Sequence, residues 1–233
     1  MRKRFEKYET WFTLSLIVVY VAANAYCVQT FGDVSFAGLL VNTLLSVGLL
    51  ALLLALKRTA YYGLTRAQNL KECAYFLPLL LIVSVNLWNG IHLDGPASNV
   101  LLHVGTMLNV GFIEEIIFRG FLFKMMAKNN VKSAVVVSAL TFGMGHIINL
   151  LNGAELIPTL LQIGYATAIG YLFVVIFLKS QSLVPCILTH SLMNALSIFH
   201  ADAPVSPYVS AAFLMIVPLL YAFAINRRCK KPR

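Results

Sequence analysis

Charged residues are scarce in this chain of 233 residues, because only 12% of its positions are charged and 59% are hydrophobic. Soluble domains average about 25% charged and about 45–50% apolar residues. The shortage of charge therefore excludes an ordinary soluble globule, and the high apolar content excludes an intrinsically disordered chain. The composition predicts an all-α, polytopic transmembrane helical bundle. No repeat or low-complexity tract divides the sequence, so residues 1–233 are predicted to form a single integral-membrane domain.

Cysteine is scarce as well. The chain has 4 cysteines, and none of them forms a CxxC pair. No two of them are expected to meet on the oxidising side of the membrane, and no Cys–His spacing typical of a metal site occurs. The sequence therefore predicts neither a disulfide nor a thiolate metal site.

Long apolar runs dominate the sequence. A membrane-spanning helix needs about 20 mainly apolar residues to cross a hydrocarbon core about 30 Å thick. The sequence contains eight candidate spans, of which the third and the seventh are short. We predict these spans at 11–31, 36–56, 73–88, 97–123, 133–151, 156–178, 182–199 and 207–226.

The basic residues fall on one side of the membrane when the loops are assigned alternately to its two faces. Of the 18 Lys and Arg residues, all except Arg119 belong to this side. The positive-inside rule makes it the cytoplasmic side and places both termini there. The same rule accounts for the net charge of +9, so we expect a lipid bilayer and no nucleic acid as partner. The opposite loops contain no Lys or Arg, and their charged residues are all acidic, namely Asp33, Asp94, Glu155 and Asp202.

Three ionisable residues lie inside the fourth span, namely Glu114, Glu115 and Arg119. Each costs roughly 2.5–3.5 kcal/mol at the centre of a bilayer, so all three are expected to face a protein interior or a water-filled cavity. Glu115 and Arg119 are four positions apart and share a helical face, which predicts an ion pair. A purely structural pair that holds helices together remains the alternative for these two residues.

Further polar residues lie at a similar depth on two other spans. The fifth span carries Phe142 and His146, and the seventh carries His190 and Asn194, each pair four positions apart. At about 1.5 Å of rise per residue, the histidines, Asn194 and Glu114 fall in one layer near the middle of the membrane. One shared polar cavity is therefore predicted. Asn149 lies on roughly the face of His146 and is expected to line the cavity, whereas Phe142 is expected to pack or to contact substrate.

The predicted cavity has the groups needed for hydrolysis. No Ser-His-Asp set accompanies them, so water is the expected nucleophile, activated by Glu114 with His146. Neutral His190 and Asn194 are able to donate hydrogen bonds to a developing oxyanion. The alternative is that both histidines are hydrogen-bonded packing residues without a chemical role.

Three motifs on separate spans resemble those of the CAAX-protease and bacteriocin-processing (CPBP or Abi) family of intramembrane proteases. They are EEIIFR (Glu114–Arg119), FGMGH (Phe142–His146) and HSLMN (His190–Asn194), which match EExxxR, FxxxH and HxxxN in the family's order. The resemblance implies a protease domain with its core at about 97–199 and an intramembrane endopeptidase activity.

The resemblance also implies roles for the motif residues. Glu114 matches the family's water-activating glutamate, and His146 matches its assisting histidine. His190 and Asn194 match the groups proposed to stabilise the oxyanion, and Arg119 matches the residue that orients Glu115. Members of the family have been described both as zinc enzymes and as metal-independent glutamate proteases. We expect no obligatory cofactor; the alternative is Zn²⁺ held by Glu114, His146 and His190.

The expected substrate is a membrane-embedded or lipid-associated peptide or protein. A non-catalytic bacteriocin-immunity or scaffold protein with the same fold is the alternative function. An ion-coupled transporter is a weaker alternative, since the sequence shows no inverted repeat. The chain is expected to be a multi-pass integral membrane protein, in the plasma membrane if the source is a bacterium.

Overall fold

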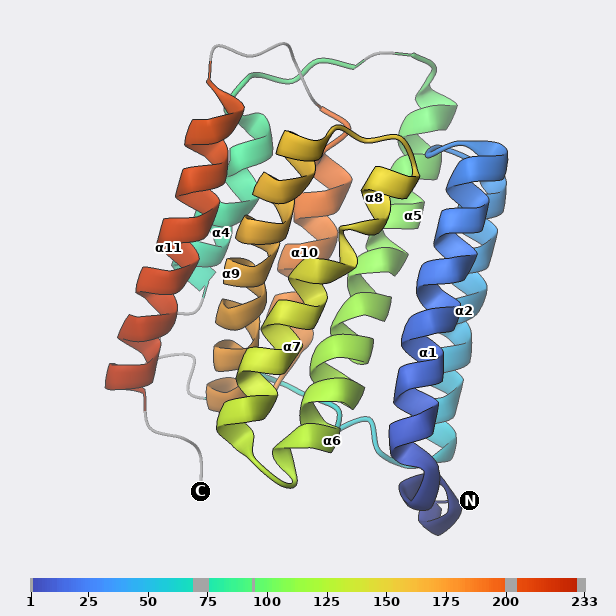
Figure 1. The fold of residues 1–233 in the computed structure, drawn as a ribbon, viewed down its shortest axis with the longest axis vertical. Coiled ribbons are helices and arrows are strands. Elements are labelled where there is room, and N and C mark those ends of the chain that lie inside the picture. The colour runs from blue at the N-terminus through green and yellow to red at the C-terminus, as the bar shows by residue number, and fades with distance from the viewer. Residues whose placement is uncertain (1, 69–75, 94, 200–204, 230–233) are drawn as a thin grey trace.

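Helices make up all the regular structure of the described residues, 2–68, 76–93, 95–199 and 205–229, in the computed structural model. The predicted all-α fold is therefore confirmed. The chain forms a bundle whose long helices run roughly side by side (Figure 1). In chain order the elements are α1 (Arg2–Phe31), α2 (Phe36–Ala55), α4 (Phe76–Ser84), η1 (Val85–Leu87), α5 (Ala97–Glu115), η2 (Ile116–Phe123), α6 (Lys124–Ala127), α7 (Val131–Gly145), α8 (Ile148–Leu151), α9 (Leu156–Ser180), α10 (Val184–Leu196) and α11 (Pro207–Arg228).

The helices are long and apolar enough for a multi-pass integral membrane protein. Among the described residues, six of them are able to cross a membrane by length and composition. Two shorter apolar helices, Phe76–Leu87 and Val184–Leu196, lie where the short third and seventh spans were predicted. Residues 73–75 of the predicted third span lie outside the described residues. The number of eight crossings stays a prediction. The six candidate spans are Phe5–Phe31, Phe36–Ala55, Ala97–Ala127, Val131–Leu151, Leu156–Ser180 and Pro207–Arg228.

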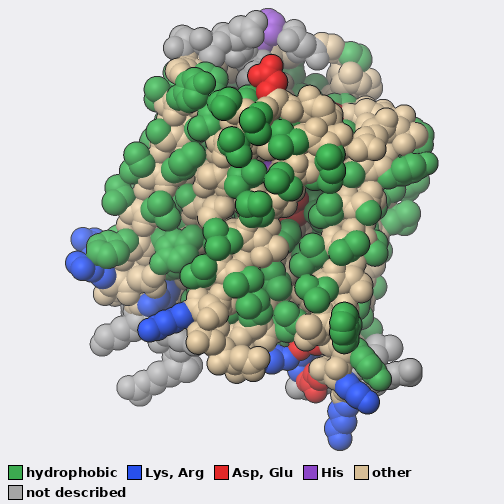
Figure 2. Space-filling model, in the orientation of Figure 1, with side chains coloured by type: hydrophobic (Ala, Val, Ile, Leu, Met, Phe, Trp, Pro, Cys, Tyr) green, Lys and Arg blue, Asp and Glu red, His purple; other side chains and the backbone are tan. Residues whose placement is uncertain are grey.

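The two ends of the bundle differ in charge. The start of α1 and the end of α11 lie at the same end of the bundle, the lower end in Figure 1. On the face shown in Figure 2, Lys and Arg side chains gather at this end. We call it the basic end. Several charges used to predict the topology lie outside the described residues, namely Lys71, Asp94, Asp202, Lys230, Lys231 and Arg233.

Glycines let pairs of helices approach closely around the centre of the bundle. A Cβ atom on Gly111 of α5 would lie 2.3 Å from Ser191 Oγ of α10, and one on Gly143 of α7 would lie 2.0 Å from Thr167 Oγ1 of α9. Small residues at such crossings are typical of membrane helices, because they allow backbones to touch. Gly143 therefore allows α7 and α9 to pack closely. Gly145 differs, because a Cβ there would meet nothing within 4 Å.

The cysteines differ in part from the sequence prediction. Cys27 and Cys186 are free and buried. Cys229, at the end of α11, is disulfide-bonded, so the prediction that the chain has no disulfide is wrong for this residue. The prediction failed because a disulfide depends on which cysteines the fold brings together, and cysteines that are close in space need not be close in sequence.

Candidate active site

The EEIIFR motif lies where the helix of the fourth predicted span changes its winding. The α-helix α5 ends at Glu115 and continues as η2, a π-helix over Ile116–Phe123. All eight residues of η2 are buried. Wider π-helical turns are rare and are frequently found at functional sites. This change was not predicted, because a π-turn has no distinct pattern of hydrophobic residues.

Glu115 and Arg119 form the predicted ion pair in a fully buried position. Arg119 Nη1 donates to Glu115 Oε1 at 3.0 Å, and both side chains are 0% exposed. The guanidinium carbon of Arg119 lies 4.0 Å from the ring centre of Phe142 and 5.7 Å from that of Phe173, which allows cation–π attraction. Within the described part of the chain, Arg119 Nε, Arg119 Nη2 and Glu115 Oε2 have no hydrogen-bond partner. The pair is therefore held by one hydrogen bond and two aromatic faces.

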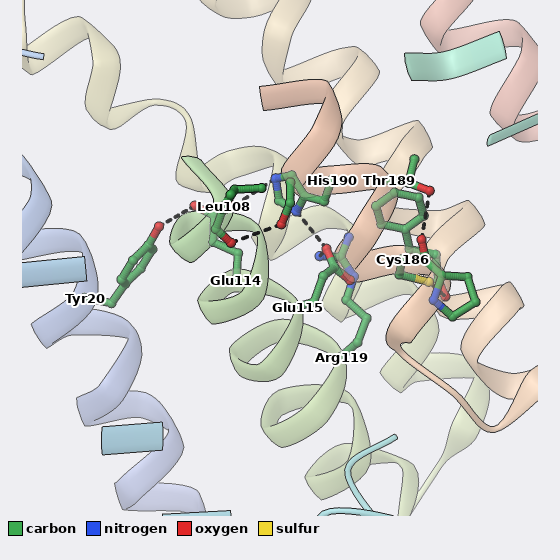
Figure 3. A network of polar contacts seen from close by, with 11 residues as sticks. Tyr20, Leu108, Glu114, Glu115, Arg119, Cys186, Thr189 and His190 are labelled. Atoms are coloured by element: carbon green, nitrogen blue, oxygen red, sulfur yellow. Dashed lines mark hydrogen bonds and ion pairs between the residues drawn. The ribbon is translucent and has the colours of Figure 1, made fainter. Parts of the chain in front are cut away.

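His190 of α10 lies between the two glutamates of α5, as Figure 3 shows. Its Nδ1 donates to Glu115 Oε1 at 2.9 Å, since an ionised carboxylate only accepts. Its Nε2 lies 3.5 Å from Glu114 Oε2. Arg119 thus orients Glu115, and Glu115 in turn fixes the imidazole ring of His190. The contact between Glu115 and His190 joins residues 75 positions apart, and the sequence analysis did not predict it.

Glu114 has a second partner on the first helix. Tyr20 of α1 donates its hydroxyl hydrogen to Glu114 Oε1 at 2.7 Å. Figure 3 shows Tyr20 reaching Glu114 from the side opposite to His190. Tyr20 is buried, with 6% of its surface exposed, whereas 15% of the Glu114 side chain is exposed. Tyr20 was not predicted from the sequence, because a tyrosine within an apolar run has no characteristic spacing from the motif residues.

One cavity of about 390 Å³ lies next to these groups. Its wall includes Glu114, His146, His190 and Asn194, which are the four residues predicted to share one polar layer. The structure thus brings the four side chains together, while their chemical roles stay predictions. Other wall residues that the motifs did not indicate include Tyr20, Asn24, Asn86, Asn152, Gln162 and Tyr165.

Phe142 and Asn149 also belong to the cavity wall. The Phe142 ring packs edge-on against His146, with ring centres 5.7 Å apart, and against His190, with ring centres 5.5 Å apart. It therefore separates Arg119 from the cavity and supports both imidazoles. Asn149 donates from Nδ2 to Gln162 Oε1 at 2.8 Å, which joins α8 to α9.

The backbone around Asn194 is fixed by His103 of α5. The Nε2 atom of His103 donates to the carbonyl oxygen of Asn194 at 3.1 Å. Ser197 Oγ donates to the same oxygen at 2.7 Å. The bond from His103 ties the end of α10 to α5, and the bond from Ser197 caps the end of α10 itself. The Asn194 side chain lies at the cavity wall. His103, which belongs to none of the three motifs, thus has a structural contact.

The zinc alternative requires Glu114, His146 and His190 to bind one ion. Within the described residues, no group of three or more His, Cys, Asp and Glu side chains is arranged to hold a metal ion. In this arrangement His190 lies between the carboxylates of Glu114 and Glu115.

Comparison with known families identifies this part of the chain. Residues 96–196 match the family model described as Type II CAAX prenyl endopeptidase Rce1-like. This region of the chain is therefore similar to the CAAX-protease family. The matched region contains all three motifs, and it confirms the resemblance predicted from them. The similarity indicates a membrane-embedded endopeptidase. Neither a curated protein nor a solved structure matches the chain significantly.

Tyr20 lies outside the region that the CAAX-protease model covers. The hydrogen bond between Tyr20 and Glu114 nevertheless makes α1 part of the site. The wall of the cavity therefore includes residues of α1 that lie outside the matched region.

Proposed function

We propose that this protein is an intramembrane endopeptidase that hydrolyses a peptide bond through a water molecule activated by Glu114. The observation that supports this most is the position of Glu114 at the wall of a cavity shared with His146, His190 and Asn194. A carboxylate that shares a cavity wall with two imidazoles and an amide is the set of groups that general-base hydrolysis requires.

In the proposed reaction, Glu114 accepts a proton from water, assisted by His146. The hydroxide adds to the carbonyl carbon of the scissile peptide bond, and the carbonyl oxygen becomes an oxyanion. The Asn194 amide donates a hydrogen bond to this oxyanion, and His190 Nε2 donates a second one when the ring is in the imidazolium form, in which both nitrogens carry hydrogen. When the tetrahedral intermediate collapses, the C–N bond breaks and the leaving nitrogen takes up the proton from Glu114. Glu115 and Arg119 act behind the cavity wall by holding the ring of His190.

We propose further that this chemistry needs no metal ion, and we derive no step through zinc. The expected result is that cleavage by the purified protein persists at full rate after dialysis against EDTA. Loss of activity on dialysis and its recovery on addition of Zn²⁺ alone would contradict this part of the proposal.

The proteolytic function is tested by comparing the peptides released by cells that express the wild-type chain with those released by cells that express Glu114→Ala at equal levels. We expect a set of peptides that appears only with the wild-type protein, because the variant keeps the fold but lacks the base. Identical sets from both cells would contradict the proposal. In that case the alternatives of a binding or immunity role would account for the fold.

Tyr20→Phe is expected to lower kcat about ten- to a hundredfold and to leave KM nearly unchanged. Hydrogen bonds to charged groups contribute about 1.5–3 kcal/mol, and this bond holds the carboxylate of Glu114 rather than the substrate. Steady-state kinetics on a released peptide sequence measures the effect. Tyr26→Phe is the matched control, since Tyr26 lies on the same helix and 64% of its surface is exposed. Equal kcat values for both variants would exclude a positioning role for Tyr20.

A further inference from the structure

The basic end of the bundle faces the cytoplasm by the positive-inside rule. The described Lys and Arg side chains belong to the helix ends and loops of this end, apart from the buried Arg119. Figure 2 shows their concentration at the lower end of the face that it draws. They include Lys7, Lys57, Arg58, Lys124, Lys128, Lys132, Lys179, Arg227 and Arg228.

Between the catalytic level and the basic end, aromatic side chains fill the bundle. η2, which leads from Glu115 toward the basic end, has all of its side chains buried. Phe121 of η2 packs against Tyr62 with ring centres 4.6 Å apart, and both are 0% exposed. Phe123 packs against Phe177 of α9 with ring centres 6.0 Å apart. These rings therefore pack the interior of the bundle on the basic side of Glu114.

The segment after α2 closes the same end. Leu183 N donates to Gly63 O at 2.8 Å, and Gln68 N donates to Ser180 O at 2.8 Å. Gly63 has a φ of +83°, and a Cβ there would lie 2.6 Å from a ring carbon of Phe177. Only glycine fits this position without strain. The segment therefore packs closely against the end of α9 and the start of α10.

The cavity extends in the opposite direction. On α1 its wall runs from Tyr20 to Val28, away from the basic start of that helix, and on α10 it begins at His190 and continues to Ser197, beyond the end of the helix. Phe118, one turn below Glu114, is the wall residue of the α5–η2 helix that lies nearest the basic end. Ser197 is exposed and Asn152 is partly exposed. These residues mark the mouth of the cavity at the end remote from the basic residues.

The chemistry of the wall indicates what the cavity accepts. Asn24, Asn86, Asn149, Asn152 and Gln162 present amides, which bind the N–H and C=O groups of an extended peptide. Among the described wall residues there is no Lys or Arg. The cavity therefore offers no cation to pair with the carboxylate of a substrate's C-terminus.

We infer that the catalytic cavity opens to the extracytoplasmic face and accepts an uncharged, internal segment of a peptide presented on that face. This inference rests on the proposed proteolytic function as far as the substrate is concerned. It places the substrate among exported peptides and the extracytoplasmic parts of membrane proteins. The prenylated C-termini of cytoplasmic proteins lie on the wrong side of the membrane and carry a charge that the wall does not neutralise.

Labelling of introduced cysteines tests the direction of the opening without depending on catalysis. Gly145 lines the cavity and has free space for a side chain, so Gly145→Cys reports on its interior. Lys132→Cys reports on the basic end, where Lys132 is exposed. Right-side-out and inverted vesicles are treated with a membrane-impermeant maleimide, and the wild-type chain supplies the background of native cysteines.

We expect Gly145→Cys to react only in right-side-out vesicles and Lys132→Cys only in inverted vesicles. Reaction of Gly145→Cys only in inverted vesicles, or in neither preparation, would overturn the inference. Asn152→Cys at the mouth repeats the test at a position where the added thiol leaves the catalytic groups untouched. A reaction of Lys132→Cys in right-side-out vesicles only would show that the basic end faces outward and would overturn the inference as well.

The peptides released only by the wild-type chain test the substrate. Segments from extracytoplasmic regions with uncharged residues around the cleavage point support the inference, whereas C-terminal tripeptides of cytoplasmic proteins overturn it. A complete absence of Glu114-dependent peptides contradicts the proposed function, while the labelling result still decides where the cavity opens. The two failures are therefore distinguishable.

Discussion

Glu114→Gln is expected to lower the rate of peptide cleavage about 10²–10⁴-fold, which is the usual contribution of general acid–base catalysis. Glutamine keeps the size of the side chain and still accepts the hydrogen bond from Tyr20, but it does not take a proton from water. The variant is therefore expected to fold and to bind substrate as the wild-type protein does. Single-turnover kinetics on a released peptide sequence, with thermal unfolding in detergent, separates loss of chemistry from loss of structure.

Glu155→Gln is the matched control for this variant. Glu155 allows the same change from carboxylate to amide at an exposed position before α9 that does not line the cavity. We expect its activity to equal that of the wild-type protein. If Glu114→Gln retained comparable activity, the water-activating role of Glu114 would be excluded and another base would have to be sought.

Arg119→Met is expected to destabilise the folded protein by about 3–5 kcal/mol, because it leaves the buried carboxylate of Glu115 without its counter-charge. Glu115 and Arg119 are both 0% exposed, so water does not compensate for the loss. Methionine retains much of the length of the arginine side chain against Phe142 and Phe173. Thermal unfolding in a fixed detergent measures the change in stability.

The double variant Glu115→Gln/Arg119→Met tests the cause of this destabilisation. Removing both charges eliminates the unpaired carboxylate, so the double variant is expected to be more stable than Arg119→Met alone. It is still expected to cleave slowly, because the ring of His190 loses the carboxylate that orients it. Equal stability of the single variant and the wild-type protein would show that the pair is not what holds α5, α7 and α10 together.

Much of the fold followed from elementary rules. Apolar runs predicted the positions of the long helices, and the shortness of the third and seventh predicted spans corresponds to α4 with η1 and to α10. The cost of burying charge indicated that Glu114, Glu115 and Arg119 face inward. The four-residue spacing predicted the bond between Glu115 and Arg119, because both lie on one helix.

Contacts between different helices were beyond the reach of these rules. The bond from His190 to Glu115 depends on the close crossing of α5 and α10 at Gly111 and Ser191, and helical periodicity carries no information about such crossings. Tyr20 reaches Glu114 only because α1 packs beside the site. Counting residues from the helix ends placed the polar groups at one depth in the membrane, but it did not show whether they face one another. The shape and the open end of the cavity therefore required the structure.

The bond from Tyr20 to Glu114 joins the first helix to one made much later during synthesis. His190 emerges from the ribosome later still, so the wall of the cavity is complete only when nearly the whole chain has been inserted. A polypeptide that ends before α10 consequently has Glu114 and Tyr20 but lacks His190. If the proposed function is correct, such a chain would not hydrolyse the proteins that surround it, and hydrolysis would begin only after α10 has been inserted.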